Sequence, residues 1–157
     1  MCEKIRTRIW CMLLPKDDKH LFIGDAKKSL IQLSTSSFVP VKIYQGFPED
    51  IYSFACTSDS NTLFAGHYKG YLTEICVESQ EVSKSYGKIH FDSIVSMEID
   101  PKDKMLWTSG YDHYMKQINI PEQKVFKCLG QIQANDVEAI CKFFCPKQVR
   151  LYPLWVG

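Results

Sequence analysis

The sequence lacks an excess of charge of either sign. Its 157 residues include 19 Lys and Arg against 18 Asp and Glu, and the formal net charge is +1. Proteins that bind nucleic acid or an anionic membrane surface carry a clear basic excess. The most basic stretches, Lys27 with Lys28 and residues 142–150, are short and typical of solvated surface. We therefore expect no nucleic acid and no membrane among the main partners.

Long apolar runs are also absent, and none approaches the roughly 20 residues needed to cross a bilayer. Residues 1–8 carry charge and no long apolar run follows them, so we expect no secretory signal. The 7 cysteines are scattered, and the one close pair, Cys141 and Cys145, lacks the second pair or nearby histidine of a zinc site. These absences predict a protein of the reducing cytoplasm that uses no metal and no cofactor.

Motifs of catalysis are missing as well. The sequence contains no glycine-rich phosphate loop, no His-Glu-x-x-His and no Gly-x-Ser-x-Gly around any serine. This favours a protein that is not an enzyme.

The chain does contain a repeat with a spacing of 42 to 43 residues. Each unit opens on an apolar segment, and in the first three units a leucine followed by an aromatic residue comes twelve residues later. The opening residues are Ile9, Ile51, Ile94 and Val137, and the pairs are Leu21-Phe22, Leu63-Phe64 and Leu106-Trp107. A period in this range is typical of the blades of a β-propeller.

Each unit divides into four short β-segments separated by turn-forming residues, which is an all-β pattern. A column of small residues, Cys11, Ser53 and Ser96, fits a crowded inner strand, and the second segment ends on Gly24, Gly66 or Gly110. We predict one partial propeller over residues 1–157, with blades at about 6–49, 50–92 and 93–136. Residues 137–157 form a degenerate fourth unit that fails after its first strand, because Pro153 cannot donate to a strand ladder. The alternative fold is a β-sandwich.

Residues 90–101 and 106–113 resemble a WD repeat (tryptophan–aspartate repeat), and the weaker resemblance of the other units extends it over residues 6–144. In that family a histidine, a serine and an aspartate form a buried hydrogen-bond network, and the matching residues here are His90, Ser109 and Asp112. The family's tryptophan is replaced by Ile118 in this unit. The resemblance therefore implies that the network lacks its fourth hydrogen-bond donor and holds the adjoining strands less firmly.

His90, Ser109 and Asp112 are also the residue types of a serine hydrolase. Catalysis requires an exposed nucleophile and an oxyanion hole as well as a histidine and an acid. Because the sequence offers no nucleophile elbow, the structural interpretation is favoured.

Three units are fewer than the four to eight blades of a closed propeller. Three interpretations follow: the chain is a fragment of a longer propeller, its ring is completed by another chain or by a second copy of itself, or its last residues pack back as a fourth unit.

The resemblance implies a non-enzymatic scaffold that binds other proteins. The alternatives are a structural subunit that completes another chain's ring and, less favoured, an enzyme on a propeller scaffold. The face that such propellers use for partners is expected to carry Phe47, Tyr68, Lys69, Phe91, Tyr111 and His113.

Overall fold

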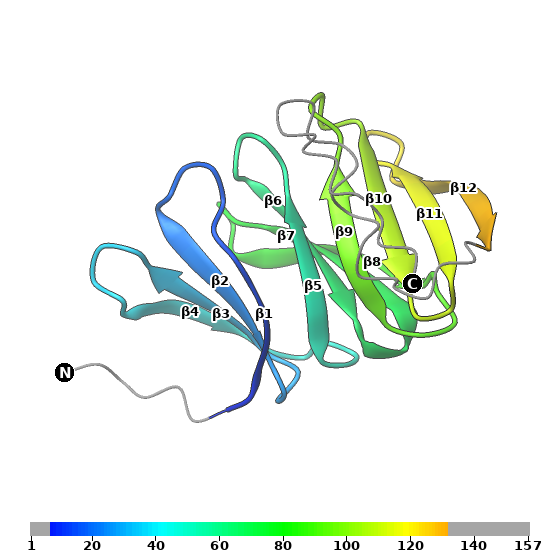
Figure 1. Ribbon diagram of the computed structural model, residues 1–157. Coiled ribbons are helices and arrows are strands. Elements are labelled where there is room, and N and C mark those ends of the chain that lie inside the picture. The colour runs from blue at the N-terminus through cyan, green and yellow to red at the C-terminus, as the bar shows by residue number, and fades with distance from the viewer. Residues whose placement is uncertain (1–6, 132–157) are drawn as a thin grey trace, which may run out of the picture.

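The computed structural model describes residues 7–131, which form three antiparallel sheets of four strands each (Figure 1). The first sheet contains β1 (Ile9–Leu13), β2 (His20–Asp25), β3 (Leu30–Ser34) and β4 (Pro40–Tyr44). The second contains β5 (Ile51–Cys56), β6 (Thr62–His67), β7 (Tyr71–Cys76) and β8 (Glu81–Lys88), with a short 3-10 turn, η1 (Tyr68–Gly70), between β6 and β7. The third contains β9 (Ile94–Ile99), β10 (Met105–Gly110), β11 (Tyr114–Asn119) and β12 (Lys124–Gln131).

In every sheet the strands lie in chain order from the first to the fourth. The first strands of neighbouring sheets pack on one another, β1 on β5 and β5 on β9, while the fourth strands fan outward (Figure 1). This arrangement is an arc of three propeller blades. It confirms the all-β fold with three four-stranded units, and it is not a β-sandwich. The expected fourth unit at 137–157 lies outside the described residues.

The aromatic column of the repeat forms the contact between blades. Phe22 lies fully buried between the first and second blades, in a cluster with Ile51, Phe54 and Leu63. Phe64 is its counterpart between the second and third blades. Because strand side chains alternate between the two faces, the second blade directs one apolar face to the first blade and the other to the third.

The small-residue and glycine columns bring the first strand of one blade close to the next blade. Ser53 Oγ donates a hydrogen bond to the Ile94 carbonyl at 2.7 Å, and Cys11 Sγ makes the same contact with the Ile51 carbonyl at 3.4 Å. A Cβ atom added to Gly66 would lie 2.6 Å from Ser53 Oγ. Larger residues in these columns would separate the inner strands.

Each first strand carries a β-bulge at its second residue. On β1, Ile9 pairs with Asp25 and Cys11 pairs with Gly24, so one residue of β1 has no partner on β2. The same irregularity occurs on β5 and β9. The extra residues are Trp10, Tyr52 and Val95. A bulge turns a side chain away from the regular alternation of the sheet.

The first blade has an apolar face that points away from the second blade. Ile23, Ile31 and Leu33 form a separate buried cluster on it. At its borders Met12 is 62% exposed and Ile43 is 51% exposed. We call this face the open flank.

Candidate functional site

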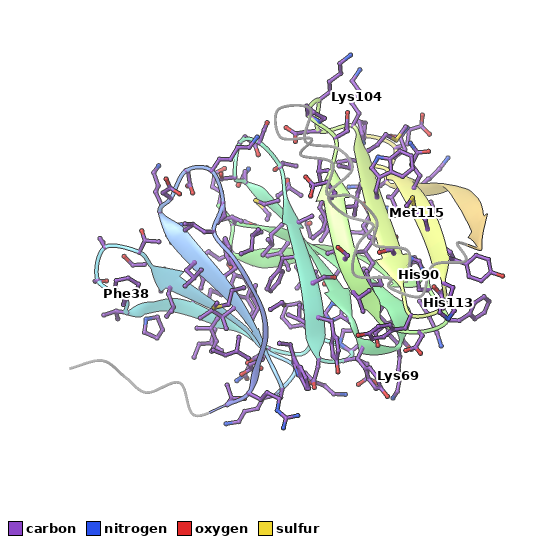
Figure 2. All side chains as sticks on the ribbon, viewed as in Figure 1. Phe38, Lys69, His90, Lys104, His113 and Met115 are labelled. Carbon is purple, nitrogen blue, oxygen red and sulfur yellow. The ribbon has the colours of Figure 1, made fainter. Side chains whose placement is uncertain are left out.

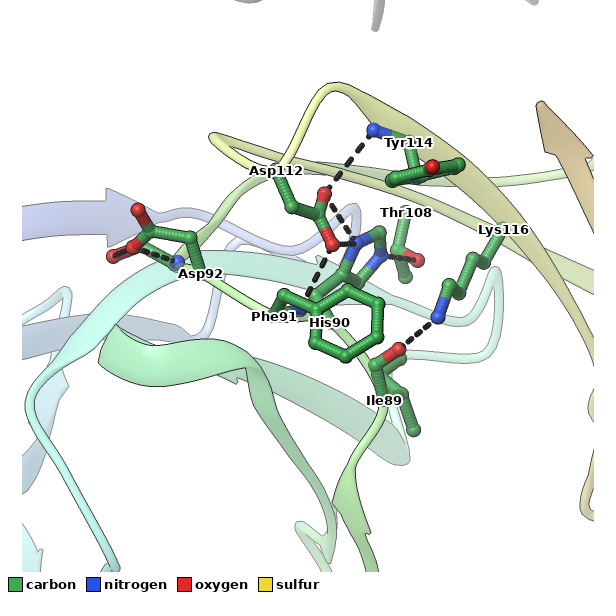
Figure 3. A network of polar contacts seen from close by, with 9 residues as sticks. Ile89, His90, Phe91, Asp92, Thr108, Asp112, Tyr114 and Lys116 are labelled. Carbon is green, nitrogen blue, oxygen red and sulfur yellow. Dashed lines mark hydrogen bonds and ion pairs between the residues drawn. The ribbon is translucent and has the colours of Figure 1, made fainter. Parts of the chain in front are cut away.

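The most extensive polar network described lies at the junction of the loop before β9 and the β10–β11 turn (Figure 3). His90 Nδ1 lies 2.9 Å from both carboxylate oxygens of Asp112, and His90 Nε2 lies 2.9 Å from Thr108 Oγ1. Asp112 also accepts hydrogen bonds from the backbone N–H groups of Phe91, at 2.8 Å, and Tyr114, at 3.1 Å. The network thus joins one strand, one loop and one turn.

Electrostatics define the protonation state of this network. Burial lowers the pKa of His90 and outweighs the opposing effect of the Asp112 carboxylate. Burial opposes ionisation of Asp112, but the hydrogen bonds from Phe91, His90 and Tyr114 hold its pKa below the ordinary value. A neutral imidazole beside an ionised carboxylate carries its proton on Nδ1 and donates it to Asp112. His90 Nε2 therefore accepts the hydrogen bond of the Thr108 hydroxyl.

The hydroxyl that faces His90 belongs to Thr108, one residue before the serine selected from the sequence. Ser109 lies beside it on β10, paired with Met115 and Ser96, and both hydroxyl residues are buried. Neither side chain is accessible to a substrate. Strand alternation places Thr108 and Ser109 on opposite faces, but it does not tell which of the two faces His90.

A second buried imidazole occupies the previous blade. His67, at the end of β6, has its Nδ1 2.9 Å from the Glu49 carbonyl and its Nε2 2.8 Å from Thr73 Oγ1. Burial lowers its pKa to about 4, against the smaller opposing effect of Glu49. His67 belongs to none of the sequence motifs, and its partner Thr73 lies on the next strand.

Most of the residues expected at the partner-binding face are exposed at one end of the blades. Phe91 is 78% exposed, and Tyr68, Lys69, Tyr111 and His113 are also exposed. Figure 2 shows Lys69 and His113 at this end and Lys104 at the opposite end. We call it the His90 end.

Phe47 corrects the expectation for this face. It is only 6% exposed, belongs to the core between the first two blades, and packs on the His67 ring with centroids 5.4 Å apart. Burial of an aromatic ring between blades excludes it from contact with a partner.

The structure adds two aromatic residues to this end that the sequence did not indicate. Trp10 and Tyr52 stack with ring centroids 4.9 Å apart, and Tyr52 stacks on Tyr68 at 5.9 Å. We call Trp10, Tyr52 and Tyr68 the aromatic row. Trp10 and Tyr52 are the bulge residues of β1 and β5, and pairing between strands of two blades cannot be read from one strand's sequence.

Two further findings concern only residues 7–131. In this range no three His, Cys, Asp or Glu side chains are grouped as a metal site requires. The same range contains no helix long and apolar enough to span a membrane. The Cys141 and Cys145 pair lies outside it.

Comparisons with known proteins identify the fold. No protein-family model matches the sequence, and the comparison with curated proteins finds no match. Among solved structures, that of U3-55K matches with a TM-score of 0.78 and that of the RRP9 WD40 repeats with 0.77, both at 18% sequence identity. The matches cover 84% of this chain but only 42% and 41% of those chains. The chain thus has the WD40-type propeller fold and spans about two-fifths of the length of these structures.

Proposed function

We propose that this chain is a non-enzymatic protein-interaction module whose contact surface is the His90 end. The observation that carries the proposal is the combination of exposed aromatic side chains with a backbone fixed from beneath. Phe91 exposes its ring while its backbone N–H is held by the buried Asp112 carboxylate. Exposed aromatic residues on rigid turns are typical anchors of protein interfaces, because they contribute contact area at a small cost in conformational entropy.

The buried hydroxyls and the neutral imidazole of His90 support the non-enzymatic part of the proposal. A hydrolase needs its nucleophile at a surface that the substrate reaches. The four cysteines with described side chains, Cys11, Cys56, Cys76 and Cys128, are free thiols, which supports a place in the reducing cytoplasm.

A capture experiment with paired variants tests the proposed surface. The immobilised 157-residue chain is compared with Tyr68→Ala/Phe91→Ala and with the control Val82→Ala/Val125→Ala, whose exposed residues lie on the outer strands β8 and β12. We expect a set of proteins that the wild type and the control retain and the Tyr68/Phe91 variant loses. Each protein of this set is then purified and its affinity measured directly. Equal capture by all three forms contradicts the proposal.

The open flank favours a second candidate function, that of a subunit completing a ring with further blades. Its exposed border residue Met12 corresponds in the repeat to Phe54 of the second blade, which is buried in the core between the first two blades. Exposed apolar faces of this kind mark interaction sites. Partner-dependent conversion of the chain from aggregate to soluble complex supports this function.

A further inference from the structure

The aromatic row is covered by a cation at each of its two ends. The Arg8 guanidinium carbon lies 5.1 Å from the centroid of the Trp10 ring, and Lys69 Nζ lies 5.6 Å from that of Tyr68. The ring faces are turned toward one another and toward these cations. The row therefore offers a partner its ring edges, its two phenol hydroxyls and the two cationic groups.

The fold holds this row in place from both blades. The bulges direct Trp10 and Tyr52 out of their strand ladders, and the Tyr68 N–H donates to the Asp50 carbonyl at 2.8 Å. Trp10 Nε1 donates to Asp50 Oδ2 at 3.3 Å. In the third blade the bulge residue is Val95, so the row is confined to the first two blades.

Positive charge around the row exceeds the negative charge available to neutralise it. Lys28 and Lys69 share a single carboxylate, that of Glu49, at 2.9 and 2.7 Å. The Asp50 carboxylate accepts hydrogen bonds from Trp10 and from the Lys28 backbone. Within residues 7–131, Arg8 forms no ion pair.

The two ends of the blades also differ in charge. The His90 end carries the cations Arg8, Lys27, Lys28, Lys69 and Lys88 and the carboxylates Asp25, Glu49, Asp50, Asp92 and Asp112, so its charges balance. The turns at the opposite end carry more carboxylates than cations, with Asp17, Asp18, Asp59, Glu78, Asp100, Asp103 and Glu122 against Lys16, Lys19, Lys102 and Lys104. The opposite end therefore repels an acidic partner more than the His90 end does, and attraction at the His90 end comes from the cations beside the aromatic row.

We propose that the aromatic row, with Arg8, Lys28 and Lys69, binds an acidic peptide segment. Two or more Asp or Glu side chains of the peptide pair with these cations, and its apolar atoms lie along the ring edges. This inference rests on the proposed function and names the chemistry of its partner.

A nucleic acid also carries negative charge, but the geometry of the row disfavours it. Binding of single strands depends on bases that stack on free aromatic faces. In the row, Trp10 and Tyr52 stack on one another with ring centroids 4.9 Å apart and an interplanar angle of 18°, so a base cannot insert between these two rings. A peptide needs only the edges, hydroxyls and charges.

Fluorescence anisotropy with the full chain tests the proposal. The probe is a fluorescein-labelled dodecapeptide in which Glu alternates with Gly and Leu. The reference probes are the same peptide with Lys in place of Glu and a labelled twelve-nucleotide oligothymidylate. We expect saturable binding of the acidic peptide alone, weakened by added salt.

Two double variants locate the site. Arg8→Gln/Lys69→Gln removes two cations beside the row, and Lys102→Gln/Lys104→Gln removes two cations from the opposite end without a difference in net charge between the variants. We expect the dissociation constant to rise at least tenfold for the first and to stay within twofold for the second. Trp10→Leu, checked for folding by its melting temperature, is expected to raise it at least fivefold.

Equal losses in the two double variants overturn the proposal, because they indicate attraction by overall charge. Absence of saturable binding of the acidic peptide also overturns it. So does an oligothymidylate that binds more tightly than the acidic peptide and whose binding Arg8→Gln/Lys69→Gln abolishes. If the acidic peptide fails but the capture experiment with Tyr68→Ala/Phe91→Ala succeeds, the interaction function stands and the partner has a different chemistry. If both fail, the proposed surface is wrong as well.

Discussion

At the scale of single residues, two buried imidazoles perform the same task with different partners. His90 links the hydroxyl of Thr108 to a carboxylate, whereas His67 links the hydroxyl of Thr73 to a backbone carbonyl. In each case a strand hydroxyl is tied to the loop that enters a blade. The described side chains leave no buried polar atom without a hydrogen bond.

Replacing Thr108 tests the network at this scale. Thr108→Val keeps the volume but leaves His90 Nε2 without a donor, and an unpaired buried polar group costs about 1–3 kcal/mol of the free energy of unfolding. Thr108→Ser keeps the hydroxyl and is the matched control, so it is expected to be the more stable of the two. Denaturant unfolding monitored by circular dichroism measures both. A Thr108→Val protein as stable as the wild type contradicts the hydrogen bond.

The pKa of His67 predicts a dependence of stability on pH. Burial lowers it from 6.5 to about 4, so the unfolded chain binds this proton below pH 6.5 and the folded chain only below about pH 4. Within this window the unfolded state binds more protons, and the free energy of unfolding falls as the pH decreases, by about 3 kcal/mol over the whole window.

Denaturant unfolding between pH 7.5 and 4 measures this effect, with His67→Asn as the variant that removes the titrating group. We expect the variant to be less stable at pH 7.5 and to lose less stability on acidification than the wild type. An NMR titration of the His67 ring should give a midpoint near 4. A midpoint near 6.5 contradicts the prediction.

At the scale of elements, turns and bulges decide where side chains of the His90 end point. The η1 turn brings Gly70 against the loop of the next blade, and its carbonyl accepts hydrogen bonds from the N–H groups of Ile89 and His90. Gly70 has a φ of +87°, and a Cβ atom there would fall on the His90 carbonyl. Glycine is thus required both by conformation and by close approach.

Gly70→Ala is expected to destabilise the chain strongly. Positive-φ strain and the clash with a neighbouring backbone together cost about 3 kcal/mol or more. Gly46→Ala is the control, since Gly46 has a φ of +84° but no atom within 4 Å of an added Cβ, and strain alone costs about 1 kcal/mol. Thermal and denaturant unfolding of both variants measure the difference. Equal losses contradict the close contact between η1 and the His90 loop.

At the scale of the whole molecule, the open flank is the feature with the largest consequence. Neighbouring blades in this fold contact one another through apolar faces. The first blade has a second apolar face, built around Ile23 and Ile31, that points away from the second blade. Exposed apolar surface of this kind drives association.

Charged substitutions on the open flank should therefore reduce self-association without loss of fold. The variant Met12→Lys/Ile43→Lys replaces two exposed residues by lysine, so its melting temperature is expected to differ little from that of the wild type. Light scattering after size-exclusion chromatography should show a smaller mass than for the wild type. The control Val82→Lys/Val125→Lys alters residues that are 45% and 46% exposed on outer strands. Equal effects of the two variants contradict a role of the flank.

The sequence alone determined the blade architecture, because a propeller repeats one packing problem at a fixed interval. The columns of Ile51 and Phe64 recur where two blades meet, and the glycine and small-residue columns recur where inner strands approach. The resemblance to a WD repeat also singled out His90 and Asp112, whose side chains lie 2.9 Å apart in the structure.

Only the tertiary structure decided which residues share a surface. Thr108 rather than its neighbour faces His90 because the strand has a definite register, and Phe47 is buried because the second blade covers it. Trp10, Tyr52 and Tyr68 lie far apart in sequence and become one row through two bulges and the packing of β1 on β5. Local patterns fix strands, but contacts between blades depend on how the strands are placed in three dimensions.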